Sequence, residues 1–91
     1  MVAALPHVQI MSRPGCCLCD EAAAIVADAG RRLLCTWEQV DIDADEDLNR
    51  RYGLDIPVVL IDGEICFRHH VDAEALDAML ARKRREQGVA A

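Results

Sequence analysis

The chain has 91 residues, of which 53% are hydrophobic and 29% charged, with a formal net charge of −6 and a pI near 4.8. This length allows one small domain, which we place at residues 1–91 with its core at about 6–82 and a frayed tail from about residue 86. No apolar run approaches the roughly 20 residues that cross a bilayer, the first residues do not resemble a secretory signal, and the negative charge opposes nucleic-acid binding. We therefore expect a cytoplasmic monomer without membrane or nucleic-acid partners.

The first predicted elements are a strand at His7–Met11, a turn at Ser12–Gly15 and a helix that begins at Cys16 or Cys17 and runs to Ala29. Apolar residues recur in the helix at steps of three and four, which places them on one face. They are Leu18, Ala22, Ile25, Val26 and Ala29. Gly30 is the type of residue that ends a helix.

A second strand is predicted at Leu34–Ile42, with Trp37 and Val40 as contributors to the core. Five acidic residues follow or overlap its end: Asp41, Asp43, Asp45, Glu46 and Asp47. This run lacks the glycine and the closing glutamate of a calcium-binding EF-hand loop. We interpret its last acids as the start of a short helix at Glu46–Tyr52 that ends at Gly53.

The remaining elements are a strand at Ile56–Ile61, a hairpin turn at Asp62–Gly63, a return strand at Glu64–Arg68 and a last helix capped by Asp72. The apolar face of that helix comprises Val71, Ala75, Leu76, Met79 and Leu80. The basic run Arg82–Arg85 fits the C-terminal end of a helix, where cations offset the dipole. The order β-α-β-α-β-β-α predicts an α/β fold in which a mixed sheet carries helices on both faces.

Five cysteines are many for this length, and three of them, Cys16, Cys17 and Cys19, fall within four positions. An odd number excludes a fully paired disulfide framework, and a cytosolic chain uses close cysteines for catalysis, redox sensing or metal binding. Cys16 lies at the expected N-terminus of the first helix, where unpaired N–H groups favour a thiolate. Cys19 follows one turn later, so this C-x-x-C offers an attacking and a resolving thiol.

Other interpretations of the cluster remain open. Cys17 and Cys19 would point about 200° apart on a helix, and a disulfide between Cys16 and Cys17 would be strained. Zinc is the main rival, with three thiols and His69 or His70 as ligands, but no second pair of ligands is present. We expect Cys17 to be exposed, and the remaining two cysteines, in the predicted strands, to be buried hydrophobic residues.

The segment Ser12–Cys19, S-R-P-G-C-C-L-C, closely resembles the active-site segment of glutaredoxins, and Ile56-Pro57-Val58 resembles the family's second landmark. The chain is similar over about residues 6–82 to the small bacterial glutaredoxin-like proteins of the thioredoxin superfamily. The resemblance implies a thioredoxin-like fold with a four-stranded mixed sheet and three helices. It also implies that Cys16 attacks, Cys19 resolves the mixed disulfide, Pro57 is cis and the Ile56 backbone pairs with substrate.

Two departures from glutathione-dependent glutaredoxins concern the substrate. Their last helix is preceded by Gly-Gly and an acidic cap; here Arg68 and His69 replace the glycines, while Asp72 remains as the cap and a predicted substrate-binding residue. The two residues inside the motif are Cys17 and Leu18 rather than Pro-Tyr, and this pair tunes the redox potential. Arg13 could offset the acidic residues of the first helical turn, and we include it among the substrate-binding residues.

We therefore predict a thiol–disulfide oxidoreductase that serves cell redox homeostasis. We expect it to act on a disulfide-containing protein or on glutathione as co-substrate, with no bound cofactor and no metal. One alternative is a redox sensor or interaction module without turnover. Another is a metal or iron–sulfur site built from the cysteine cluster.

Overall fold

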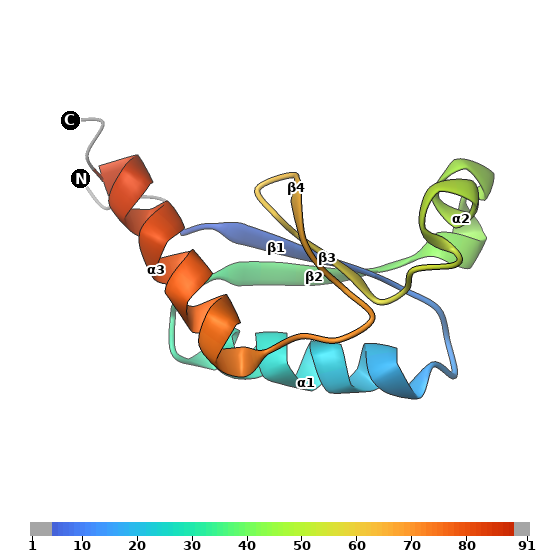
Figure 1. Ribbon diagram of the computed structural model, residues 1–91, viewed down its shortest axis with the longest axis horizontal. Coiled ribbons are helices and arrows are strands. Elements are labelled where there is room, and N and C mark those ends of the chain that lie inside the picture. The colour runs from blue at the N-terminus through green and yellow to red at the C-terminus, as the bar shows by residue number, and fades with distance from the viewer. Residues whose placement is uncertain (1–4, 89–91) are drawn as a thin grey trace.

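The structure is a computed structural model that describes residues 5–88. Its elements are β1 (His7–Ser12), α1 (Cys17–Arg31), β2 (Thr36–Asp41), the 3₁₀ helix η1 (Ile42–Ala44), α2 (Glu46–Tyr52), β3 (Val58–Ile61), β4 (Glu64–Arg68) and α3 (Ala73–Gly88) (Figure 1). The predicted order of strands and α-helices is confirmed. No helix among the described residues is long and apolar enough to span a bilayer.

The four strands form one mixed sheet in the order β2-β1-β3-β4. The central strand β1 runs parallel to β2 and antiparallel to β3, so that Ile10 lies between Gln39 and Val59. The β3–β4 hairpin turns through Asp62 and Gly63, whose φ angles of 49° and 87° are both positive. Two successive positive φ angles are typical of the tight hairpin turn that the Asp-Gly pair predicts.

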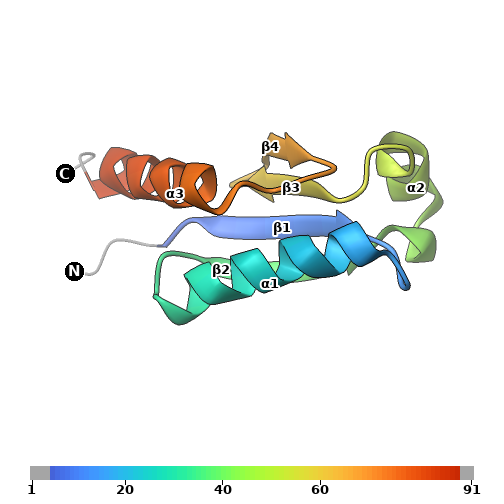
Figure 2. The same ribbon diagram turned by 60° about the horizontal axis from the view of Figure 1, so that its bottom comes forward.

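The two faces of the sheet carry different helices. On one face, α1 and α3 cover β1 and β3, and the fully buried side chains there include Ile10, Val26, Ile61 and Leu76. On the other face, the short helix α2 and η1 cover only one end, where Ile42 is fully buried. Figure 2 shows α1 lying along the sheet and α2 confined to the end that β1 reaches.

The predicted end of the first helix at Gly30 is wrong, because α1 continues to Arg31 and the left-handed residue is Leu33, with φ 63°. Gly30 has a different role. A Cβ atom added there would lie 2.9 Å from Cδ1 of Trp37, so the glycine lets α1 approach the indole of β2. Trp37 thus packs against the helix although 37% of its surface is exposed.

The second strand is shorter than predicted and ends at Asp41. The carboxylate of Asp41 accepts a hydrogen bond from the Asp43 backbone N–H at 2.9 Å and so caps η1. Asp45 caps α2 in the same way, by accepting hydrogen bonds from the backbone N–H groups of Asp47 and Leu48. The acidic run therefore starts two short helices in succession, where the sequence predicted a loop and one helix.

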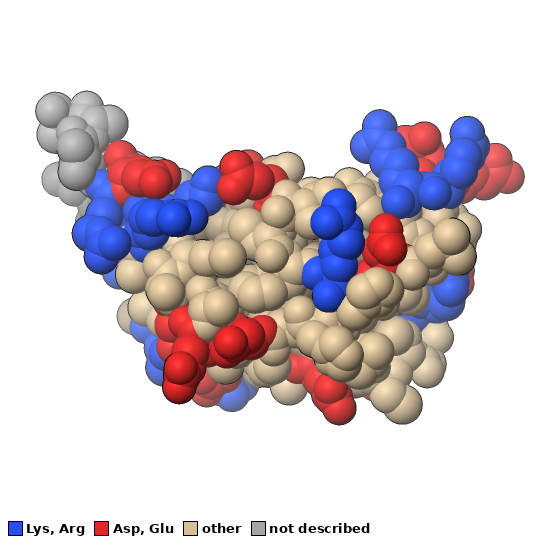
Figure 3. Space-filling model, in the orientation of Figure 1, with Lys and Arg blue, Asp and Glu red and all other residues tan. Residues whose placement is uncertain are grey.

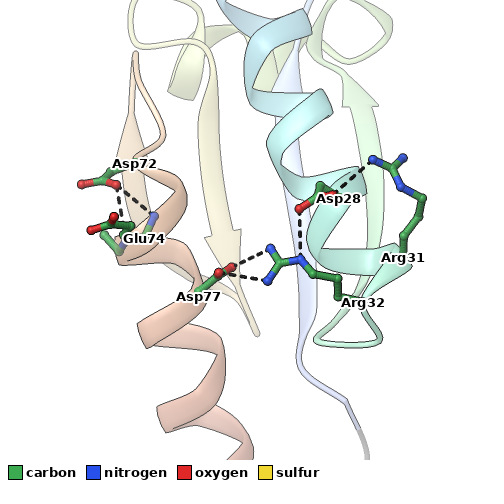
Figure 4. Close-up of polar contacts among 7 residues, drawn as sticks. Asp28, Arg31, Arg32, Asp72, Glu74 and Asp77 are labelled. Carbon is green, nitrogen blue, oxygen red and sulfur yellow. Dashed lines mark hydrogen bonds and ion pairs between the residues drawn. The ribbon is translucent and has the colours of Figure 1, made fainter.

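Arg32 joins the two helices that share one face of the sheet (Figure 4). Its guanidinium donates to both carboxylate oxygens of Asp77 in α3 at 3.0 Å and to Asp28 in α1 at 3.0 Å. Among the described residues, Arg31 contacts only Asp28, at 3.4 Å. Such a planar, bidentate contact fixes the orientation of the guanidinium relative to the carboxylate as well as the distance between them.

The start of α3 agrees with the prediction. Asp72 accepts hydrogen bonds from the backbone N–H groups of Glu74 at 3.0 Å and Ala75 at 3.5 Å. The basic run Arg82–Arg85 lies in the later turns of α3, and Figure 3 shows basic side chains gathered there. The helix continues to Gly88, and residues 89–91, part of the predicted frayed tail, lie outside the described residues.

Candidate functional site

The three clustered cysteines lie just beyond the carboxyl end of β1, where a four-residue connection leads into α1. Gly15 has φ 81°, a left-handed conformation in which glycine is favoured. The backbone N–H of Cys16 then donates to the Arg13 carbonyl at 3.3 Å, which closes the turn. The connection therefore delivers Cys16 to the first position before the helix.

Cys16 is the N-cap residue of α1, and its sulfur takes part in the cap. The backbone N–H of Cys19 donates to Cys16 Sγ at 3.2 Å. This N–H is one of the groups at a helix start that have no partner within the helix. A negative charge on Cys16 Sγ is stabilised by that donor and by the positive end of the helix dipole. The predicted position of Cys16 is confirmed.

Cys19 lies one helical turn after Cys16, and its side chain is fully buried. Burial is the main cause that raises the pKa of the Cys19 thiol to about 11; the neighbouring Cys16 side chain acts in the same direction, and a hydrogen bond from the Arg13 backbone acts against it. We call Cys16 and Cys19 the dithiol pair: one partly exposed sulfur on the helix N-terminus and one buried protonated sulfur behind it.

The predicted second landmark lies at the same end of the sheet. The last β1–β3 pair is Met11 with Val58, so Pro57 is level with the end of β1, where the cysteine loop begins. The Ile56–Pro57 peptide bond is cis, as the resemblance implies. Within residues 5–88 the backbone groups of Ile56 make no hydrogen bond to another residue. They are available to an added strand.

Arg13 is held by a contact that the sequence did not reveal. Its Nε donates to both carboxylate oxygens of Asp43, at 3.1 and 3.0 Å, and the Asn49 side-chain amide donates to the same carboxylate at 2.7 Å. The cysteine loop is therefore tied to η1 and α2. Asp43 and Asn49 lie 30 and 36 positions beyond Arg13 in the chain, and no local pattern indicates this pairing.

The corner between β4 and α3 lies where glutathione-dependent glutaredoxins carry Gly-Gly. His69 has φ 68°, and its backbone N–H donates to the carbonyl oxygens of Pro57 at 2.9 Å and Asp55 at 3.3 Å. Its ring lies 3.8 Å from the Asp55 carboxylate. Asp72, a predicted substrate-binding residue, uses one carboxylate oxygen to cap α3. The corner thus keeps a left-handed backbone but carries side chains that glycine lacks.

The other cysteines are separate from the dithiol pair. Cys17 is exposed, as expected; Cys35 is buried and Cys66 half-buried, and burial raises the pKa of both of these thiols. Among residues 5–88, no three side chains of His, Cys, Asp or Glu converge in a group that could hold a metal ion. The zinc interpretation therefore has no geometric support in this part of the chain.

Comparison with known proteins agrees with this arrangement. The sequence profile of the Glutaredoxin-like domain (DUF836) matches residues 7–81. The chain belongs to this family. A curated relative, the glutaredoxin-like protein YDR286C homolog of Dictyostelium discoideum, is 33% identical over 76 residues, which cover 77% of this chain and 70% of the relative. This glutaredoxin-like domain also matches the uncharacterized protein Mb0520 of Mycobacterium bovis, with 30% identity over 85% of the chain and 84% of that protein.

Solved structures show the same fold. A structural genomics target from X. campestris, XcR50, superimposes with a TM-score of 0.68 at 31% identity, over 82% of this chain and 96% of that one. A mutant thioredoxin from Halobacterium salinarum superimposes with a TM-score of 0.64 at 19% identity, over 87% of this chain and 74% of that one. The glutaredoxin-like domain therefore has the thioredoxin fold, and the family supports a redox role.

Proposed function

We propose that this protein is a thiol–disulfide oxidoreductase in which Cys16 attacks and Cys19 resolves. The observation that carries the proposal is the position of Cys16 at the N-cap of α1, where the backbone N–H of the buried Cys19 donates to Cys16 Sγ at 3.2 Å. A helix N-terminus stabilises the thiolate that attacks and that leaves again when the reaction is reversed.

The reaction has two balanced steps. The Cys16 thiolate attacks one sulfur of a partner disulfide, the S–S bond breaks, and the other partner sulfur leaves as a thiolate. Cys19 then loses its proton and attacks Cys16 Sγ, which releases the second partner thiol and forms the Cys16–Cys19 disulfide. The partner gains two electrons and two protons, and the dithiol pair loses them. A protein disulfide or glutathione disulfide would both serve as partner in this scheme, in the cytoplasm.

The experiment is a redox titration of the purified chain in defined glutathione buffers, followed by thiol alkylation and intact mass. We expect one reversible two-electron transition that is lost in Cys16→Ser and in Cys19→Ser. Cys17→Ser and Cys66→Ser are the matched controls and should retain it. Failure to form a Cys16–Cys19 disulfide at any buffer ratio would refute the mechanism and favour a redox-independent binding role for the fold.

A further inference from the structure

Leu54 is the most exposed large apolar side chain among the described residues, with 95% of its surface accessible. It lies in the loop between α2 and β3, two residues before Ile56. Single exposed leucines are common and need no explanation. This one lies two residues before Ile56, whose backbone groups have no partner in residues 5–88, at the end of the sheet where β1 leads into the cysteine loop. Leu33, which is 70% exposed, lies beyond the other end of α1.

The loop that carries Leu54 is held on both sides. The Asp55 N–H donates to the Tyr52 carbonyl at 2.9 Å, and the Asp55 carbonyl accepts from the His69 N–H at 3.3 Å. Tyr52 and Ile56 pack against the core of the α2 face. The apolar side chains on either side of Leu54 thus point into the protein, while a fixed backbone presents Leu54 to solvent.

The charges around the loop are asymmetric. Arg68 lies opposite Val58 on β4, next to the bonded Asp55–His69 corner, and is exposed without an ion pair among the described residues. Arg50, four residues before Leu54 in α2, is also exposed and unpaired in that part of the chain. Most neighbouring acids already have partners. Asp43 pairs with Arg13 and Asp47 with Arg51. Asp55 lies 3.8 Å from the His69 ring, which offsets its charge only when the imidazole is protonated, and Glu46 has no ion pair among the described residues.

The β2 side of the cysteine loop has the other sign, since Asp20 in the first turn of α1 lines a pocket there with Asp41 at the end of β2. In a chain of net charge −6, the two free arginines beside Leu54 are a local exception. A ligand that approaches Ile56 therefore meets an apolar side chain and positive charge on the loop side. Complementary charge would steer an acidic partner to that side.

We propose that the disulfide partner is a polypeptide whose reactive cysteine is flanked by an apolar residue and by carboxylates, and that Leu54, Arg68 and Arg50 recognise it. The inference rests on the oxidoreductase function above and specifies its substrate class. The extended partner pairs with the Ile56 backbone, its apolar side chain covers Leu54, and its carboxylates face the two arginines. Glutathione has no apolar side chain to cover Leu54, so it uses only part of this surface.

The test measures how fast the reduced protein reacts with mixed disulfides of thionitrobenzoate and a cysteine peptide. The Cys16 thiolate attacks the peptide sulfur, the S–S bond breaks, and coloured thionitrobenzoate leaves. Three peptides of equal length place leucine and glutamates, alanine and glutamates, or leucine and lysines around the cysteine, and the glutathione derivative is the small probe. We expect the leucine–glutamate peptide to react roughly five to ten times faster than the other two.

Matched variants assign the effect to residues. Leu54→Ser should lower the rate with the leucine–glutamate peptide about fivefold and leave the rate with the glutathione probe unchanged. Leu33→Ser should change neither rate. Arg68→Gln should reduce the preference for glutamate over lysine, as should added salt, and Arg84→Gln on α3 should not. Equal rates for the three peptides, or equal effects of Leu54→Ser and Leu33→Ser, would overturn the docking proposal. If the glutathione probe still reacted, the proposed oxidoreductase function would stand. Absence of reaction with every probe would overturn both.

Discussion

The backbone N–H of His69 donates a hydrogen bond of 2.9 Å to the carbonyl oxygen of Pro57, which joins the β4–α3 corner to the strand start beside the dithiol pair. This bond requires His69 to adopt a φ of 68°, which L residues adopt at a cost of about 1 kcal/mol or more. The corner therefore keeps a glycine-like backbone while it presents an imidazole ring.

His69→Gly should change the free energy of unfolding by less than about 1 kcal/mol, because relief of the strained φ offsets the greater freedom of glycine in the unfolded chain. His70→Gly is the control; its φ is not left-handed, so it should lose about 0.5 to 1 kcal/mol. Urea denaturation of both variants measures the difference. A loss of more than about 2 kcal/mol in His69→Gly would show that the imidazole itself stabilises the corner.

The same variant probes access of glutathione to the site. Removal of the His69 side chain leaves the left-handed corner intact and opens space beside Pro57. We expect His69→Gly to increase the rate with glutathione disulfide severalfold, whereas His70→Gly should not. Stopped-flow measurement with excess glutathione disulfide provides the rates, and unchanged rates in His69→Gly would show that the ring does not hinder glutathione.

The raised pKa of Cys19 predicts a pH-dependent second step. The thiol, with a pKa of about 11, is protonated at neutral pH, and only its thiolate attacks the mixed disulfide on Cys16. The rate of the resolving step should therefore increase about tenfold per pH unit between pH 7 and 9, when followed from a preformed mixed disulfide. A rate that levels off below pH 9 would contradict this burial effect.

Cys19 also links pH to stability. Its pKa is about 9 as an unperturbed group and about 11 in the fold, so the native state holds the proton more tightly than the unfolded state. The stabilisation from this proton is fully present below pH 9. The free energy of unfolding then falls by up to about 2 kcal/mol as the pH rises to about 11. Cys19→Ser should show a smaller loss between pH 8 and 11 in urea denaturation, and equal losses would assign the effect to other groups, such as Cys35 and Cys66.

Gly30→Ala tests the close approach of α1 to Trp37. Alanine is the better helix former by about 1 kcal/mol, but its Cβ would lie 2.9 Å from the indole. We expect a net loss of roughly 1 kcal/mol and a shift of Trp37 fluorescence. In a Trp37→Thr background the same change should stabilise the protein, and a double-mutant cycle separates the two effects. Stabilisation in the original background would refute the packing argument.

Arg32→Lys tests the clamp between α1 and α3. Lysine retains the charge but cannot contact both oxygens of Asp77 in one plane. We expect faster amide hydrogen exchange in the first half of α3, with a difference that shrinks in high salt. Arg31→Lys, which alters only the contact with Asp28, is the control. Identical exchange in the two variants would show that Asp77 does not hold α3 through Arg32.

Local signals and tertiary contacts explain which parts of this fold could be predicted. The bounds Glu46–Tyr52 and Glu64–Arg68 were predicted correctly, since a capping aspartate and an Asp-Gly turn act within a few residues. Gly30 was misinterpreted as a helix stop because its role depends on Trp37, on a different element. The C-x-x-C spacing and Ile56-Pro57 indicated the site.

The remaining features of the site depend on residues that are distant in sequence. The tie from Arg13 to Asp43 spans 30 positions, and many exposed acids in the chain could have paired with Arg13. The exposure of Leu54 could not be predicted from the sequence either, since the nearby apolar residues Tyr52 and Ile56 pack against the core. Only the folded chain shows which of the three points outward.

The position of β1 at the centre of the sheet has a consequence for synthesis of the chain. Cys16, Cys17 and Cys19 follow this strand within seven residues, but β3, which pairs with β1 and completes that end of the sheet, begins at Val58, about forty residues later. At typical translation rates of roughly 5 to 20 residues per second, the three thiols precede that strand by about two to eight seconds. During this interval Cys19 lacks the burial that keeps it protonated in the native state. The nascent chain is therefore most sensitive to oxidants before β3 has been made.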